Sequence, residues 1–228
     1  MHNENHLKSS DTIRDIVIGM SDGLTVPFAL AAGLSGAINS STIVVTAGIA
    51  EIVAGSIAMG LGGFLAGKTE ADHYSSELQR EYEEVERVPE QEKTEVMEVF
   101  ADFGLSPTLQ RQVADEMAKD KDKWVDFMMR YELGLEKPEA NRATQSAITI
   151  GFSYIVGGII PLSPYFFISN SQMALYYSCG ITLICLFVFG YFKSKVTGQN
   201  PVNGALKVVV IGALAAAAAF LVARQITG

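Results

Sequence analysis

The sequence predicts an all-α membrane protein, with five transmembrane helices and a three-helix cytoplasmic insertion between spans two and three. Three observations support this fold class. Of the 228 residues, 49% are hydrophobic and only 18% are charged. The segment 68–142 contains 20 acidic and 11 basic residues, whereas the rest of the chain contains 5 acidic and 6 basic residues. On both sides of that segment the apolar runs are long enough to cross a bilayer as helices, which takes about 20 residues each.

Five apolar stretches follow one another along the chain. The polar run Asn39–Thr42 separates the first two, and the prolines and serines between Pro161 and Ser171 separate the third from the fourth. The first stretch is too long for a signal peptide and lacks a cleavage pattern, so we expect it to be retained as a span. The predicted spans are 14–37, 43–67, 143–162 and 172–192. The fifth is a shorter, Ala-rich stretch, 208–223, and its helix is expected to begin near Asn203.

The positions of Lys and Arg predict the orientation, because cytoplasmic loops are enriched in both. Basic residues precede span one, bracket the insertion and follow span four, whereas the two other short loops have none. We therefore expect the N-terminus and the insertion in the cytoplasm and the C-terminus on the far side. Arg224, at the end of span five, is the one exception to this pattern. The flanking basic residues are Lys8, Arg14, Lys68, Arg142, Lys193 and Lys195.

Small residues four apart allow membrane helices to approach closely. Gly19 and Gly23 have this spacing in span one, and Gly63 and Gly67 have it in span two. This pattern predicts that spans one and two form a packed, functional pair. The alternative is that glycine is simply frequent in membrane helices.

Two carboxylates interrupt the apolar spans, and a charge at that depth usually indicates function. Asp22 lies halfway along span one, and Pro27 frees a backbone carbonyl one turn before itself. Glu51 lies in span two, and Met59 falls on the same ridge. Carboxylate and thioether together favour a transition metal ion over Mg²⁺ or Ca²⁺. Each residue also has a structural alternative. Asp22 could make a structural hydrogen bond, and Glu51 could lie hydrated near the far-side end of its span. Met59 could simply fill a gap in the core.

The insertion is predicted to contain three helices. The first continues span two to Val88, the second covers about 90–103 and ends at Gly104, and the third opens at Ser106-Pro107 and ends near Gly134. With these helices the chain divides into a disordered tail, 1–11, spans one and two, 12–67, an acidic metal-binding domain, 68–140, and spans three to five, 141–228.

Carboxylates recur three or four residues apart on the apolar faces of these helices, so that their oxygens can converge on cations. In the third helix, Trp124, Met128 and Glu132 share one ridge at i+4 spacing. The alternative is a solvated acidic face. The insertion has no His-x-x-x-His or Cys-x-x-Cys pattern, which disfavours a structural zinc site. The predicted ligands are Glu81, Glu84, Glu92, Glu95 and Glu132.

Three segments resemble the vacuolar iron transporter family: Ser21–Leu34, Ser56–Gly62, and Gly157–Leu162 with Pro164–Phe166. The resemblance extends from about residue 12 to 226. It implies a five-span homodimer that exchanges Fe²⁺ for protons along a path between the two first spans, with Asp22 and Met59 on that path. It also implies that the five glutamates collect ions and that Met128 and Met129 assist them. For Met129 the resemblance is the only support, because that residue lies off the ridge.

The predicted function is therefore export of a divalent ion from the cytoplasm, chiefly Fe²⁺, with Mn²⁺, Zn²⁺ and Co²⁺ as alternatives. The ion is a substrate, no prosthetic group is expected, and the chain is not expected to be an enzyme. The alternatives are a membrane-anchored ferroxidase, a metal sensor and a plain channel. The net charge of −8 argues against nucleic-acid binding. The expected location is the vacuolar membrane in a eukaryote and the cell membrane in a bacterium.

Overall fold

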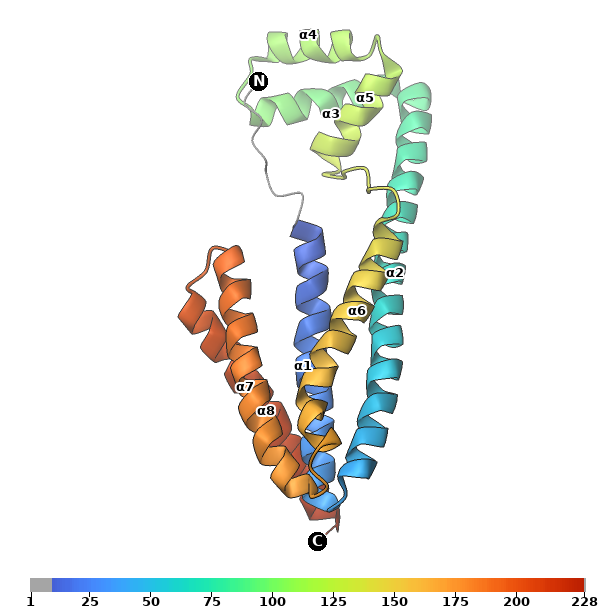
Figure 1. The fold of residues 1–228 in the computed structure, drawn as a ribbon. Coiled ribbons are helices and arrows are strands. Elements are labelled where there is room, and N and C mark those ends of the chain that lie inside the picture. Colours follow the sequence, from blue (N-terminus) through green and yellow to red (C-terminus); the bar gives the residue numbers. More distant parts are fainter. Residues whose placement is uncertain (1–9, 228) are drawn as a thin grey trace. The chain divides into compact units, whose positions relative to one another are not determined.

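A computed structural model describes residues 10–227, and within them every regular element is helical (Figure 1). The all-α prediction is therefore confirmed. Of the tail predicted for 1–11, residues 1–9 lie outside the described part, and Ser10 and Asp11 already belong to the first helix. The elements are α1 (Ser10–Ala37), α2 (Ser41–Arg87), α3 (Pro89–Asp102), α4 (Pro107–Met117), α5 (Lys121–Phe127), the π-helix η1 (Met128–Glu132), α6 (Arg142–Leu162), the 3₁₀-helix η2 (Ser163–Phe166), α7 (Ser171–Val196) and α8 (Pro201–Thr227).

The described residues divide into two compact units. One lies within Met1–Leu65 and Ala143–Gly228, and we call it the membrane unit. The other is Ala66–Arg142, which we call the acidic unit. The 47-residue helix α2 contributes to both, because no Gly or Pro interrupts it between Lys68 and Arg87.

The five predicted spans are confirmed as helices long and apolar enough to cross a membrane. The fifth helix starts at Pro201, slightly before the predicted Asn203, since proline fits the first turn of a helix. Asn170 caps α7, with its side-chain oxygen accepting from the backbone N–H of Met173 at 2.9 Å. In the described part of the chain the candidate spans are Asp11–Ala37, Ser41–Arg87, Arg142–Phe166, Ser171–Val196 and Pro201–Ile226.

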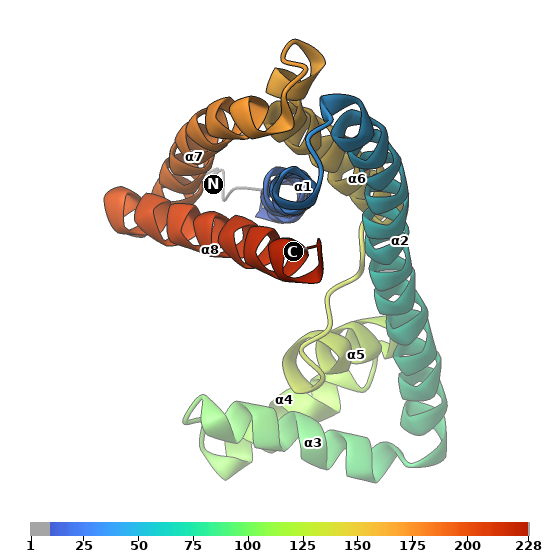
Figure 2. The ribbon, with the colours of Figure 1, turned by 90° about the horizontal axis from the view of Figure 1, so that it is seen from below.

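The glycines of the membrane unit pack against a different partner from the one predicted. A Cβ on Gly19 or Gly23 would strike the backbone of α6, at the carbonyl oxygens of Ile150 and Tyr154. On α2, a Cβ on Gly60 would lie 2.9 Å from the carbonyl oxygen of Ala147, also on α6. The glycines that were expected to join spans one and two therefore contact span three instead, whereas spans one and two share buried side chains such as Ala31 and Val44. Figure 2 shows α1 with α6 on one side and α8 on the other.

The acidic unit contains more helices than the predicted three. The helix expected over 107–134 is divided, because Asp120 accepts a hydrogen bond from the backbone N–H of Lys123 at 3.3 Å and starts a new helix there. That helix, α5, then widens into the π-helix η1. The core of the unit consists of buried side chains from all these segments: Val85, Val96, Ala114, Trp124, Val125, Met128 and Met129.

Candidate functional site

Three of the predicted glutamates meet in the acidic unit. Glu81 comes from α2, Glu92 from α3 and Glu132 from η1, and one carboxylate oxygen of each lies within 4.8 Å of the others. The side chains of Glu81 and Glu92 are each only 2% exposed, whereas that of Glu132 is exposed. Three carboxylates at this separation repel one another unless protons or a cation lie between them.

The two buried glutamates each keep one oxygen free for a ligand. Among the described residues, neither Oε2 of Glu81 nor Oε2 of Glu92 has a hydrogen-bond partner. A buried oxygen without a partner is costly, and a divalent cation is one way to satisfy it. We call this trio, Glu81, Glu92 and Glu132, the carboxylate cluster.

The electrostatics of the cluster favour a bound proton or cation. Burial, and then repulsion by Glu95 and Glu81, raises the pKa of Glu92 to about 7. Burial and the same two neighbours raise the pKa of Glu132 to about 7. Burial also raises the pKa of Glu81, with Glu84 adding to the effect and Arg80 opposing it. At neutral pH the empty cluster therefore retains protons that a metal ion would displace.

The other two predicted glutamates lie beside the cluster. Both Glu84 and Glu95 are close enough to raise the pKa of Glu92, but neither belongs to the group of three oxygens. Glu84 lies 3.5 Å from Arg80, and Glu95 accepts a hydrogen bond from Gln91 at 3.1 Å. They supply negative potential around the cluster, and their role as direct ligands stays a prediction.

The two predicted methionines lie in a segment that sequence periodicity did not reveal. Met128, Met129 and Glu132 all belong to η1, where the backbone N–H of Leu133 donates to the carbonyl of Met128 at 3.1 Å, five residues back. This wider turn breaks the predicted i+4 ridge, and it buries both Met128 and Met129 in the core. No sequence signal marked the π-helix. That either sulfur binds an ion stays a prediction.

In the membrane unit, Glu51 has a partner that the sequence reasoning missed. The hydroxyl of Tyr154 on α6 donates a hydrogen bond to Oε1 of Glu51 on α2. Tyr154 is 2% exposed, and Gly55 provides its space, since a Cβ at that position would lie 2.5 Å from the hydroxyl. Within the described part of the chain, Oε2 of Glu51 is buried without a hydrogen-bond partner. A tyrosine in the middle of a span was the available signal, because a buried hydroxyl in a membrane needs a partner.

Asp22 interacts with the same tyrosine. It is half-buried on α1, and its neighbour Gly23 packs on the backbone of Tyr154. The Asp22 carboxylate is also near enough to interact electrostatically with that side chain. Tyr154 of span three thus interacts with both predicted carboxylates, through a hydrogen bond with Glu51 and electrostatically with Asp22. Met59 is half-buried two turns along α2 from Glu51, and its role stays a prediction.

Comparison with known proteins places the chain in a family. The model of the VIT family matches residues 13–224. Vacuolar iron transporter 1 of Tulipa gesneriana is 53% identical over 225 residues, which cover 99% of this chain and 91% of the relative. Vacuolar iron transporter 1 of Arabidopsis thaliana is also 53% identical over 225 residues, covering 99% of this chain and 90% of the relative. Protein CCC1 of Saccharomyces cerevisiae is 39% identical over 218 residues, covering 91% and 67%.

These matches confirm the resemblance inferred from the segments in spans one, two and three. The plant relatives are named as transporters and not as enzymes, in agreement with the prediction that this chain is not an enzyme. The chain belongs to the VIT family, that of the vacuolar iron transporters.

Proposed function

We propose that the chain exports a divalent transition metal ion, chiefly Fe²⁺, from the cytoplasm in exchange for protons. The observation that carries this proposal is the carboxylate cluster, in which two buried glutamates each present an oxygen without a partner among the described residues. The names of the plant relatives support iron as the ion. Carboxylate bundles accept both Fe²⁺ and Mn²⁺, so Mn²⁺ is the second candidate.

The acidic unit collects ions in this mechanism. Its negative potential raises the local concentration of divalent cations. An arriving ion displaces the protons of Glu92 and Glu132 and is held by oxygens of the cluster. Glu84 and Glu95 strengthen the field, and the thioethers of Met128 and Met129 add a preference for softer ions.

The membrane unit passes the ion across. Asp22, Glu51 and Met59 mark the path, and Tyr154 orients the Glu51 carboxylate so that Oε2 remains available to the ion. A desolvated carboxylate that has lost its ion is costly, so a proton takes the place of the ion on the return step. Exchange at a single carboxylate is the simplest way to couple the two fluxes.

We further propose that the transporter is a homodimer with its path between the two first spans, and that the N-terminus and the acidic unit are cytoplasmic. The distribution of Lys and Arg supports this orientation. The names of the plant relatives support a vacuolar membrane if the source is a eukaryote. In a bacterium, the same topology would move iron out of the cell.

The test is Fe²⁺ uptake into proteoliposomes under anaerobic conditions, with and without an inwardly acidic pH gradient. We expect gradient-driven uptake by the unmodified chain and no uptake by Asp22→Ala, because that variant lacks the carboxylate of span one. Uptake that is indifferent to the gradient would identify a channel. No uptake by a preparation that still binds iron would leave the sensor or the ferroxidase.

The enzymatic alternative is a ferroxidase built on the carboxylate bundle. Bundles of that kind use Glu-x-x-His pairs as metal ligands. The acidic unit does contain one such spacing, Glu70 and His73. The His73 side chain is 58% exposed and faces Glu77 at 3.9 Å, and it is not part of the cluster. This arrangement favours the transporter.

A further inference from the structure

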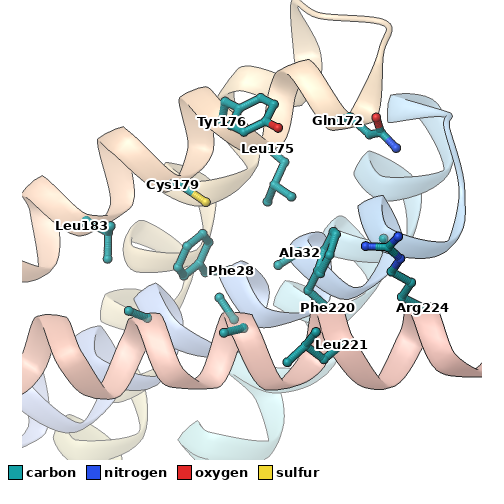
Figure 3. A pocket seen from close by; sticks show the side chains of 14 residues that line it. Phe28, Ala32, Gln172, Leu175, Tyr176, Cys179, Leu183, Phe220, Leu221 and Arg224 are labelled. Atoms are coloured by element: carbon teal, nitrogen blue, oxygen red, sulfur yellow. The ribbon is translucent and has the colours of Figure 1, made fainter.

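A large groove in the membrane unit takes no part in the proposed ion path. It has a volume of about 680 Å³ and lies between α1, α7 and α8 (Figure 3). That volume is in the range of pockets that hold organic ligands. Most of its lining is apolar, with Phe28 and Ala32 from α1, Leu175 and Leu183 from α7, and Phe220 from α8.

The charged side chain of the groove lies at one end, together with an amide side chain. Figure 3 shows Gln172 and Arg224 at that end and Leu183 at the opposite end. Gln172 lies in the first turn of α7, where the helix dipole is positive. Arg224 is exposed and forms no ion pair with any carboxylate that the structure describes.

Arg224 is also the one basic residue at the end of a span that does not fit the expected orientation. In the proposed topology, it lies on the far side of the membrane, where Lys and Arg are depleted. An arginine retained there, beside an amide donor and a helix N-terminus, matches the chemistry of a phosphate group. The apolar remainder of the groove matches an acyl chain.

We propose that this groove binds an anionic phospholipid of the far leaflet, with its phosphate at Arg224 and Gln172 and an acyl chain along the apolar lining. The charge of Arg224 then gives selectivity for anionic over zwitterionic headgroups. The occupied groove would connect α8 to α1, the helix that bears Asp22, so the lipid would brace the helix that carries the ion path.

The experiment measures lipid retention by the full chain. The protein is purified in a mild detergent, mixed with equal amounts of phosphatidylglycerol and phosphatidylcholine of the same acyl chains, and examined by native mass spectrometry. We expect phosphatidylglycerol to be retained about fivefold more than phosphatidylcholine, the effect of one basic residue at a membrane surface. Arg224→Gln should remove that preference, and Arg224→Lys should keep most of it.

Matched variants test the phosphate-binding end and the apolar lining of the groove separately. Lys207→Gln removes a positive charge from the same helix outside the groove, and it should leave the preference unchanged. Ala217 is an exposed residue of the groove lining, so Ala217→Phe fills the groove and should reduce the retention of both lipids. Ala218→Phe, at an exposed position that does not line the groove, should not.

Three outcomes would overturn the proposal. Equal retention of the two lipids by the unmodified chain would show that the groove does not select an anion. Binding of inorganic phosphate as tight as that of phosphatidylglycerol, and equally sensitive to Arg224→Gln, would show that Arg224 holds a free anion and that the acyl chain contributes nothing. If Ala217→Phe changes the ratio of monomer to dimer and leaves lipid retention intact, the groove belongs to a contact between copies of the chain.

Discussion

The acidic unit and the membrane unit differ in how many carboxylates surround a buried oxygen without a partner in the described part of the chain. In the acidic unit, three glutamates from three segments gather around one point, and two of them keep a buried oxygen without a partner in the described part of the chain. In the membrane unit, Glu51 shares one oxygen with Tyr154, and glycines bring the surrounding helices into contact. The first arrangement suits holding an ion, and the second suits releasing it, because fewer charged ligands bind more weakly.

The largest expected effect comes from disabling the cluster alone. Glu81→Gln with Glu92→Gln should weaken Mn²⁺ binding by at least about 100-fold, since losing a residue that merely orients a metal ligand already costs about 10- to 100-fold. Trp124 reports this binding selectively, because it is the only tryptophan of the chain and is buried in the core of the acidic unit. Mn²⁺ bound in the cluster should quench its fluorescence, because the ion is paramagnetic, and Mn²⁺ does not oxidise readily during the titration.

Two exposed glutamates of the same unit provide the control. Glu83→Gln with Glu90→Gln removes the same charge from the surface, and it should change the affinity by less than about threefold because long-range charge effects are screened by salt. In the transport assay, the cluster variant should raise the apparent KM and leave the maximal rate. A loss of maximal rate with an unchanged KM would contradict the division of roles between the units.

Helical spacing singled out five glutamates, three of which meet in the cluster, because a repeat of three or four residues shows which side chains share a face. It could not show which faces meet. Tyr154 and Glu51 are 103 residues apart in the sequence, so no local pattern connects them. The same limit explains the wrong partner for Gly19 and Gly23, whose spacing predicts close packing but not the helix that receives them.

Local deviations from regular helix were the other part that sequence could not supply. The i+4 ridge assumed that one α-helix continues from 107 to 134, but Asp120 starts a second helix and η1 then widens the turn. Met128 and Met129 are both buried in that wider turn, although only Met128 lies on the predicted ridge. Whether a turn is α or π depends on tertiary packing. The packing energy is larger than the small energy differences that residue propensities contribute locally.

The second prediction tests the membrane unit. Tyr154→Phe keeps the ring and removes only the hydroxyl that orients Glu51, so the apparent KM for Fe²⁺ should rise by about tenfold, the value of one hydrogen bond to a charged group. Tyr165→Phe is the matched control, since Tyr165 is equally buried in the membrane unit but shares its hydrogen bond with Ser35 at 2.9 Å.

A double-substitution cycle decides whether Tyr154 acts through Glu51. Added to Glu51→Gln, Tyr154→Phe should have little further effect on the apparent KM. Equal effects of Tyr154→Phe in the presence and absence of the Glu51 carboxylate would mean that the tyrosine only supports packing.

The third prediction concerns pH. The pKa values of Glu92 and Glu132 are about 7 in the folded chain against 4.5 for an unperturbed glutamate. Between these values the folded state binds more protons than the unfolded state, so the stability of the metal-free acidic unit should fall as the pH rises from 4.5 to 7 and change little above that. Thermal unfolding of the full chain, followed by Trp124 fluorescence, measures this dependence.

Mn²⁺ should reverse the pH effect, because it replaces the protons that the cluster loses. The Glu81→Gln and Glu92→Gln double variant should show a weaker dependence on both pH and Mn²⁺. A midpoint that rises from pH 5 to pH 7 in the metal-free chain would contradict the electrostatic description of the cluster.

The smallest expected effect distinguishes the two methionines of η1. Met→Leu conserves volume and costs little in packing, so any loss of metal affinity reports the thioether itself. Met128→Leu and Met129→Leu should each weaken Mn²⁺ binding by less than about threefold, because Mn²⁺ prefers oxygen ligands. A softer ion sharpens the test: Co²⁺ should lose more affinity than Mn²⁺ in whichever variant removes a true ligand. If both ions lose affinity equally, the methionines serve only the core, and the ligand set of the acidic unit consists of carboxylates alone.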